Sequence, residues 1–239
     1  MADQQHLRAA APVHLGEHGD EAAFNEEQML DMMEVFCQPR RAWGNGLGIA
    51  TQSGGAGVMM ADRAEEVGLA VPELGVNTQA RLGEVMPAFG AAANPVDVTG
   101  QFVARPELLT ESVVALLDDP EIDVAIVWLQ LMTAHVDALL VIFREIQERT
   151  QKPFLVCWVA APEAAIKELR AIEIPVYPAG ERAVEAAAAL SRYGMLKPSG
   201  GELAVSAFSA APKGSTGSGM QPSVEASNWL RDAGVPMAR

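Results

Sequence analysis

Short apolar runs alternate with longer helical patterns between residues 46 and 194, and this alternation constrains the fold more than any other feature. The runs are rich in β-branched and aromatic side chains and are too short for buried helices, so they predict strands. The clearest strands are residues 47–51, 124–129 and 154–159, and weaker ones lie at 69–71 and 174–177. Strands separated by helices in this way form parallel βαβ units.

The helical patterns span residues 106–117, residues 136–149 and an Ala-rich stretch at 181–192, each with apolar side chains on one face. We therefore predict an α/β fold with a doubly wound parallel sheet of about five strands, in the flavodoxin-like arrangement. Folds of this kind bind ligands at the carboxyl ends of the strands. The loops after Thr51, Leu129 and Val159 are therefore the expected place for a site.

Composition excludes several classes of protein. The chain has 17 Lys and Arg against 31 Asp and Glu, a net charge of −14, so it offers no basic surface for nucleic acid. Cys37 and Cys157 are far apart and the four histidines form no cluster, so neither a disulfide framework nor a metal site is expected. No apolar run approaches the ~20 residues that span a bilayer and no signal peptide is recognisable, so we expect a cytoplasmic protein without a membrane contact.

The two ends of the chain differ in composition from the middle. Residues 1–45 are polar apart from one stretch, ended by Pro39, whose apolar side chains recur at helical spacing. Residues 195–222 are rich in Gly, Ser, Pro and Ala, which is typical of a linker. Residues 223–239 resume a helical pattern but are too few to fold alone. We therefore place boundaries after residues 45, 194 and 222.

A glycine-rich segment, Thr51-Gln52-Ser53-Gly54-Gly55-Ala56-Gly57, lies between the first strand and a helix predicted to start near Val58. Glycines let the backbone approach an anion closely, and a helix N-terminus favours negative charge through its exposed N–H groups and its dipole. Ser53 can add a hydroxyl donor or cap the helix. The candidate phosphate site is therefore Ser53, Gly54, Gly55, Ala56 and Gly57. The alternative is a tight strand-to-helix turn without a ligand.

A second candidate is the turn-rich segment 93–100, in which Asn-Pro and Thr-Gly pairs bracket a short apolar strand. Asn94, Asp97 and Thr99 carry side chains that can hydrogen-bond to the glycine-rich segment or to a ligand. We take them as supporting residues of the candidate site. The alternative is that they form Asx turns and a helix cap.

Together these two segments resemble the NDP-forming acyl-CoA synthetases, which are relatives of succinyl-CoA synthetase. The similar stretches are residues 48–58, 61–62, 66–69, 72–74 and 94–100. The resemblance covers most of residues 46–194 and implies the second flavodoxin-like ligase domain of that family. Residues 224–236 resemble the opening helix and strand of the family's ATP-grasp domain. Residues 223–239 are therefore expected to be a truncated start of that domain, and residues 195–222 the linker before it.

The entry segment resembles the part of the family that carries a phosphorylated histidine, through the stretches 14–16 and 19–24. Residues 1–45 are then the remnant of a preceding ligase domain with its connecting helix. The resemblance implies that His14 takes a phosphoryl group from a nucleotide and passes it to an acyl carboxylate, a covalent relay that divides one difficult step into easier ones. It also implies that Ser53, Gly54 and Gly55 hold that phosphoryl group at a helix N-terminus. A solvent-exposed histidine is the alternative for His14, and a surface or capping role is expected for His135.

The resemblance implies that the chain is part of an acid–thiol ligase and is inactive alone. No cofactor is expected on this chain by itself, whereas the complete enzyme uses CoA, ATP or ADP, and Mg²⁺ on a small carboxylic acid. The expected partners are CoA-binding and ATP-grasp domains or subunits, and a homo-oligomer is compatible with the sequence. Another interpretation stays open, in which a flavodoxin-like module binds or regulates a partner without catalysis.

Overall fold

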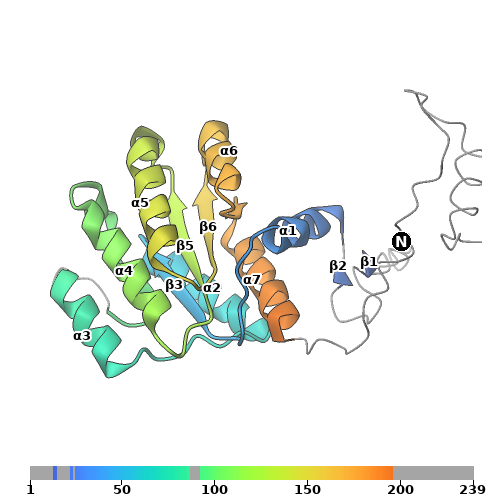
Figure 1. Cartoon of the computed structure of the whole chain (residues 1–239), viewed down its shortest axis with the longest axis horizontal. Coiled ribbons are helices and arrows are strands. Elements are labelled where there is room, and N and C mark those ends of the chain that lie inside the picture. Colours follow the sequence, from blue (N-terminus) through green and yellow to red (C-terminus); the bar gives the residue numbers. More distant parts are fainter. Residues whose placement is uncertain (1–12, 15–21, 24, 87–91, 196–239) are drawn as a thin grey trace, which may run out of the picture. The chain divides into compact units, whose positions relative to one another are not determined.

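The computed structural model describes residues 13–14, 22–23, 25–86 and 92–195 (Figure 1). The elements in chain order are β1 (Val13–His14), β2 (Ala22–Ala23), α1 (Glu26–Phe36), β3 (Leu47–Thr51), α2 (Gly54–Glu66), α3 (Val76–Val85), β4 (Val96–Asp97), η1 (Gly100–Val103), α4 (Pro106–Asp118), β5 (Val124–Gln130), η2 (Thr133–His135), α5 (Val136–Arg149), β6 (Phe154–Val159), α6 (Glu163–Ala171), β7 (Val176–Tyr177) and α7 (Gly180–Met195). The chain divides into two compact units, residues 1–196 and 197–239, and every described element belongs to the first. The predicted ATP-grasp start and nearly all of the predicted linker lie outside the described residues.

Five parallel strands form one sheet in the order β4-β3-β5-β6-β7. The first strand of this sheet along the chain, β3, thus lies between the second and the third, which is the flavodoxin-like order expected from the sequence. In the register of the sheet, Thr51 of β3 lies opposite Asp97 of β4 on one side and Trp128 of β5 on the other. The ends of β3 and β4 therefore bring the two candidate segments together at the carboxyl edge.

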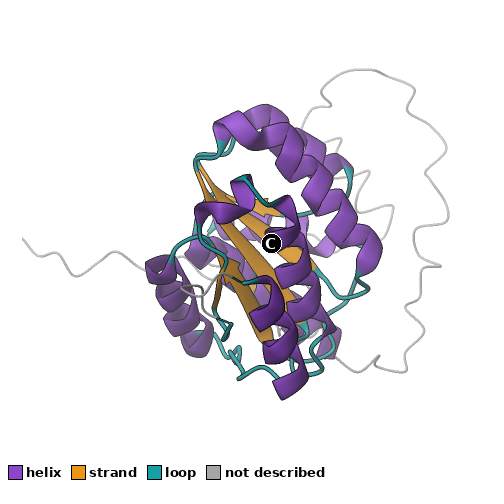
Figure 2. Ribbon diagram, turned by 90° about the vertical axis from the view of Figure 1, so that its left-hand side faces the viewer, coloured by secondary structure: helices purple, strands orange, loops and turns teal. Residues whose placement is uncertain are grey.

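Helices cover both faces of the sheet (Figure 2). Successive side chains of a strand point to opposite faces, and β5 shows this alternation directly. Its Ile126 and Trp128 pack with α1, α2 and α7, whereas Val127 and Leu129 pack with α3, α4, α5 and α6. Because both faces are buried, the strand has no polar face. This explains why the central strands read as nearly continuous apolar runs.

The structure confirms the elements predicted from the strongest sequence patterns and differs from some of those predicted from weaker ones. The predicted segments 47–51, 154–159 and 136–149 are observed as β3, β6 and α5. The predicted strand at 69–71 is wrong, because Ala70 forms only an isolated bridge to Gly46. The predicted helix start near Val58 is also wrong, because α2 begins at Gly54 and the glycines form its first turn. The patterns predict neither α3 nor α6, which bury only one and two residues and so lack a broad apolar stripe.

Helix α1 packs against α7 and the β7 edge of the sheet. The Asp31 carboxylate accepts two hydrogen bonds from the Arg182 guanidinium, at 2.6 and 2.7 Å, and the Tyr177 hydroxyl donates to the Asp31 carbonyl at 3.0 Å. The Glu34 carboxylate accepts two more from Arg170, at 2.6 and 2.9 Å. These contacts hold α1 against the domain of the five-stranded sheet through both backbone and side-chain groups.

Candidate functional site

Most of the described non-glycine residues with a strained backbone conformation lie at the carboxyl edge of the sheet. Among the described residues five non-glycine residues have positive φ, and four of them follow strands at this edge: Thr99 after β4 at 54°, Leu131 and Met132 after β5 at 63° and 55°, and Ala160 after β6 at 58°. Each such residue costs about 1 kcal/mol or more. Strain of this kind clusters at functional sites, where the surrounding structure holds it in place. The edge expected to bind a ligand thus also carries the backbone signature of a site.

The N-terminus of α2 opens at this edge with unused hydrogen-bond donors. The backbone N–H groups of Gly54, Gly55 and Ala56 have no acceptor among the described residues. Ser53 occupies the cap position, but its side chain forms no capping hydrogen bond. The Ser53 N–H instead donates to the Thr51 hydroxyl, and that hydroxyl donates to the Ser53 carbonyl, both at 3.0 Å. The α2 N-terminus therefore presents three free N–H groups and a serine hydroxyl.

The glycines of α2 are of two kinds. Gly57 is buried, and a Cβ there would lie 3.0 Å from Pro95, so this glycine allows α2 to pack closely beside the 93–100 segment. A Cβ on Gly54 would meet only the Asp97 carboxylate, at 3.4 Å, and a Cβ on Gly55 would meet nothing within 4 Å. Close packing thus explains why residue 57 is a glycine. It does not explain Gly54 and Gly55, beside which the structure leaves open space.

Asp97 ends β4 with its carboxylate turned toward α2. Its Oδ1 accepts a hydrogen bond from the Thr99 N–H at 2.9 Å, and the Thr99 hydroxyl accepts from the Gln101 N–H at 3.3 Å as the cap of η1. The expected Asx turn and helix cap are therefore present. The second oxygen, Oδ2, is the atom nearest to the Cβ position of Gly54, and it accepts no hydrogen bond from the described residues.

The Asn94 side chain serves the sheet. Its Oδ1 accepts from the Ile49 N–H at 3.0 Å, and its Nδ2 donates to the carbonyls of Leu47 and Pro72 at 2.8 and 3.2 Å. These bonds use the amide oxygen and both amide hydrogens. Asn94 thus supports the site by holding the 93–100 segment beside β3, and it does not bond to the glycine-rich segment.

Of the histidines, only His135 and the backbone of His14 lie in the part of the chain that the structure describes. The backbone of His14 lies in β1 and pairs with Ala22 of β2, and its side chain lies outside what the structure describes. His135 ends η2 and occupies the N-cap position of α5 without a side-chain capping bond. The meeting of His14 with the α2 N-terminus therefore stays a prediction.

Two side chains tie the loops of the carboxyl edge together. The Gln52 amide donates to the Gln130 carbonyl at 3.2 Å and so joins the start of α2 to the end of β5, while its Oε1 is buried without a partner. The indole N–H of Trp158 donates to the Leu131 carbonyl at 2.7 Å and holds the strained residues after β5. Sequence reasoning missed Gln52 as a positioning residue, because a polar residue in a loop is ordinary and its partner is distant in sequence.

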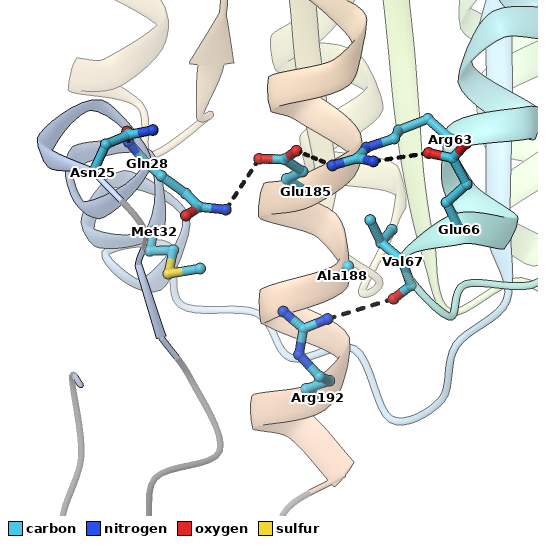
Figure 3. A pocket seen from close by; sticks show the side chains of 9 residues that line it. All are labelled: Asn25, Gln28, Met32, Arg63, Glu66, Val67, Glu185, Ala188 and Arg192. Atoms are coloured by element: carbon cyan, nitrogen blue, oxygen red, sulfur yellow. Dashed lines mark hydrogen bonds and ion pairs between the residues drawn. The ribbon is translucent and has the colours of Figure 1, made fainter. Parts of the chain in front are cut away.

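Two hollows of about 400 Å³ border α2. One lies between α2 and α7, is lined both by apolar side chains such as Trp128 and by charged ones such as Arg63, and shares Ala56 with the α2 N-terminus. The other lies among α1, α2 and α7 (Figure 3), and in it Arg63 is paired with Glu66 and Glu185. Hydrogen bonds to these carboxylates raise the Arg63 pKa. The charge of this arginine is already compensated, so Arg63 is no candidate for holding an anion.

Neither a cluster of metal-ligating side chains nor a helix fit to span a bilayer occurs in the described ranges. No three His, Cys, Asp or Glu side chains gather there in a way that could hold a metal ion. None of the helices in the same ranges is long and apolar enough to cross a lipid bilayer. The described residues therefore assign no ligand to the Mg²⁺ expected for a complete synthetase.

Comparison with known proteins identifies the family to which this fold is similar. The Ligase-CoA domain model matches residues 47–190, which is more than half of the chain. The alpha subunit of ADP-forming acetate–CoA ligase I from Pyrococcus furiosus is 34% identical over 180 residues, or 73% of this chain and 38% of that subunit. Trans-feruloyl-CoA synthase FCS1 from an unknown prokaryotic organism is 27% identical over 219 residues, or 87% of this chain and 30% of that protein. The chain thus spans about a third of the length of these relatives.

Solved structures agree with the sequence relatives. A protein from Pyrococcus horikoshii OT3 superposes with a TM-score of 0.62 and 30% identity, over 72% of this chain and 41% of that chain. Acetyl-coenzyme A synthetase 1 of Ca. Korarchaeum cryptofilum, solved in complex with phosphate and ADP, superposes with a TM-score of 0.61 and 25% identity, over 72% of this chain and 39% of that chain. The parallel sheet and these similarities show that the chain belongs to the Ligase-CoA domain family. This family is the one of the succinyl-CoA synthetase-like, ADP-forming acyl-CoA synthetases.

Proposed function

We propose that this chain is part of an ADP-forming acyl-CoA synthetase, and that its ligase domain holds a phosphoryl group during a phosphohistidine relay. The observation that carries the proposal is the N-terminus of α2, where three backbone N–H groups have no acceptor among the described residues and Gly54 and Gly55 leave the approach open. A helix N-terminus carries about half a positive charge. Its N–H groups are fixed before a ligand arrives, so they stabilise a phosphoryl group without reorganising.

The proposed reaction has three transfers. A histidine nitrogen attacks the terminal phosphorus of ATP and ADP leaves; the substrate carboxylate then attacks the same phosphorus and frees the imidazole; the CoA thiolate finally attacks the acyl carbon and phosphate leaves. His14 is the proposed carrier in this chain. CoA, the nucleotide and its Mg²⁺ bind to partner domains or subunits, and the substrate is a small carboxylic acid, as the names of the acetate and ferulate relatives suggest. This domain contributes charge stabilisation at α2.

Valine at Gly55 tests the phosphate site. A Cβ at this position meets no protein atom within 4 Å, so Gly55→Val should fold normally while its side chain obstructs the approach to the N–H groups. Gly83→Val is the matched control, because Gly83 lies in a helix, in α3, and is equally unobstructed. We expect the Kd for inorganic phosphate, measured by calorimetry, to rise at least tenfold in Gly55→Val and to stay unchanged in Gly83→Val. Equal affinity of wild type and Gly55→Val would refute the site.

Phosphorylation tests the relay. The chain is mixed with the ATP-grasp subunit of a relative and γ-labelled ATP, and acid-labile, base-stable label is measured on this chain. We expect label on the wild type and on His135→Ala, and none on His14→Ala. Label that persists in His14→Ala would exclude His14. A chain that binds phosphate but never takes up label would instead fit the non-catalytic binding module.

A further inference from the structure

Helix α1 carries an apolar stripe on the side that faces away from its own domain. The helix lies beside α7 (Figure 1) and buries Met32 and Val35 there. Leu30 and Met33, in contrast, expose 60% and 52% of their surface, and Cys37 is exposed one turn further along. Positions 30, 33 and 37 share one face of a helix. Much of the apolar pattern that marks this helix in the sequence therefore faces outward.

An aromatic cluster continues this stripe at the C-terminal end of α1. The rings of Phe36 and of Tyr193 in α7 have their centroids 5.2 Å apart. The Arg41 guanidinium lies 4.9 Å from the centroid of Tyr193 and 5.6 Å from that of Trp43. Trp, Tyr and Arg are the residues that most often dominate the binding energy of protein interfaces. Stripe and cluster together form the outer α1 surface, which consists of Leu30, Met33, Phe36, Cys37, Arg41, Trp43 and Tyr193.

The outer α1 surface has the character of a docking surface. Of the eleven large apolar side chains exposed in the described ranges, four lie on it, and Trp43 among them is 71% exposed. Monomeric proteins expose contiguous apolar patches mainly where they bind partners. Its aromatic end lies at the amino edge of the sheet, because Trp43 precedes β3 and Gly194 of α7 packs against the backbone of Ala42. A partner on this surface would leave the carboxyl edge open.

Two charges without an ionic partner mark the two ends of this surface. Glu26 is exposed, lies four residues before Leu30 on the same face of α1, and forms no ion pair among the described residues. Arg41, at the other end, stacks on two rings and likewise has no carboxylate partner within the described ranges. The remaining acidic side chains of α1 all pair with arginines of the domain: Glu27, Asp31 and Glu34.

A surface that is negative at one end and positive at the other is complementary to itself when it is turned end for end. We propose that the outer α1 surface binds a second copy of this chain, with the two α1 helices antiparallel about a two-fold axis beside Met33. Leu30 of each copy then lies opposite Cys37 of the other, and Glu26 lies opposite the end that carries Arg41. The net charge of −14 repels two copies at long range, but ~0.15 M salt screens this repulsion beyond about 8 Å.

Sedimentation velocity of the whole chain at increasing concentration, in ~0.15 M salt, measures this association. We expect the wild type to pass from monomer to dimer as its concentration rises. Met33→Glu places two carboxylates side by side at the axis and should abolish the dimer. Val141→Glu is the matched control, because Val141 is 61% exposed on α5, away from this surface, and it should leave the equilibrium unchanged. Both substituted side chains are exposed, so both variants should keep the circular dichroism spectrum of the wild type.

A charge swap tests the antiparallel arrangement itself. Glu26→Arg brings like charges together at both ends of the dimer, because each contact occurs twice, and it should weaken association about tenfold. Arg41→Glu should weaken it similarly. The double variant restores opposite charges at both ends and should recover most of the affinity. Two losses that cancel in this way show that the two residues face each other, whereas the losses of independent sites add.

Three results would overturn the proposal. A wild type that stays monomeric at every concentration would leave the outer α1 surface to a different domain or protein. A dimer that Met33→Glu does not weaken would form through another surface. A double variant that associates no more tightly than the single variants would rule out the antiparallel arrangement. None of these results bears on the phosphate site, which lies at the opposite edge of the sheet.

Discussion

Asn94→Ala should destabilise the domain strongly, because the Asn94 side chain stands in for a missing length of strand. β4 contains only Val96 and Asp97, which pair with the last two residues of β3. Earlier in β3, on the same side, the Asn94 amide accepts from the Ile49 N–H at 3.0 Å and donates to the Leu47 carbonyl at 2.8 Å. A side-chain amide thus supplies both hydrogen bonds that a longer β4 would make.

The magnitude follows from burial. Leu47 and Ile49 are fully buried, so water cannot replace the lost amide. A buried N–H left without an acceptor costs about 1 to 3 kcal/mol, and each lost hydrogen bond to a carbonyl adds roughly 0.5 to 1.5 kcal/mol. With its third bond, to the Pro72 carbonyl at 3.2 Å, the loss of the side chain should cost about 2 to 6 kcal/mol. Asn94→Asp should cost at least as much, because a carboxylate oxygen would then face two carbonyls.

Urea unfolding followed by circular dichroism measures this difference. Asn45→Ala is the matched control, since Asn45 is exposed and its side chain makes one hydrogen bond within the described residues, to the Gly68 carbonyl at 3.2 Å. We expect the control to change the free energy of unfolding by less than about 0.5 kcal/mol. The reasoning is refuted if Asn94→Ala costs no more than Asn45→Ala while the dependence on urea stays the same.

Three further predictions concern packing and charge. In the native chain a thiol reagent should modify exposed Cys37 and spare Cys157, whose pKa burial raises to about 12, and mass spectrometry that finds both modified before unfolding would contradict the packing. Gly194→Ala should lower the melting temperature by several degrees, because the added Cβ would collide with the backbone carbonyl of Ala42, in the loop before β3. An unchanged melting curve would argue against this contact. The hydrogen bond from Arg149 holds the pKa of Glu111 below its usual value, so the pair adds stability above the usual glutamate pKa and loses it as pH falls through the lowered value. Glu111→Gln should therefore flatten the acid limb of the stability curve, and identical acid limbs would count against the pair.

The fold could be predicted where burial alone decides the structure. β5 is apolar at nearly every position because helices cover both of its faces, so its run of side chains is conspicuous in the sequence. Leu69 is equally buried, yet Ala70 next to it has only one bridge partner, so burial there does not mean a strand. β4 and β7, with two residues each, carry too short a pattern to be bounded from sequence.

The site could be predicted in outline but not in its geometry. Glycine disfavours helix, so local propensity places the start of α2 after the glycines, whereas packing of Gly57 beside Pro95 lets the helix begin at Gly54. The orientation of Asp97 toward α2 depends on the register of two strands that are far apart in sequence. No local pattern contains that information, and the same holds for the bond from Gln52 to Gln130.

The central claim is that the N-terminus of α2 holds a phosphoryl group. Its most direct test is a series of amide proton–nitrogen spectra of the chain, recorded as inorganic phosphate is added. We expect saturable shifts concentrated on the N–H groups of Gly54, Gly55 and Ala56, with much smaller changes at the N-termini of α4 and α6. Shifts that are absent at these three residues, or no larger there than at the other helix N-termini, would contradict the account.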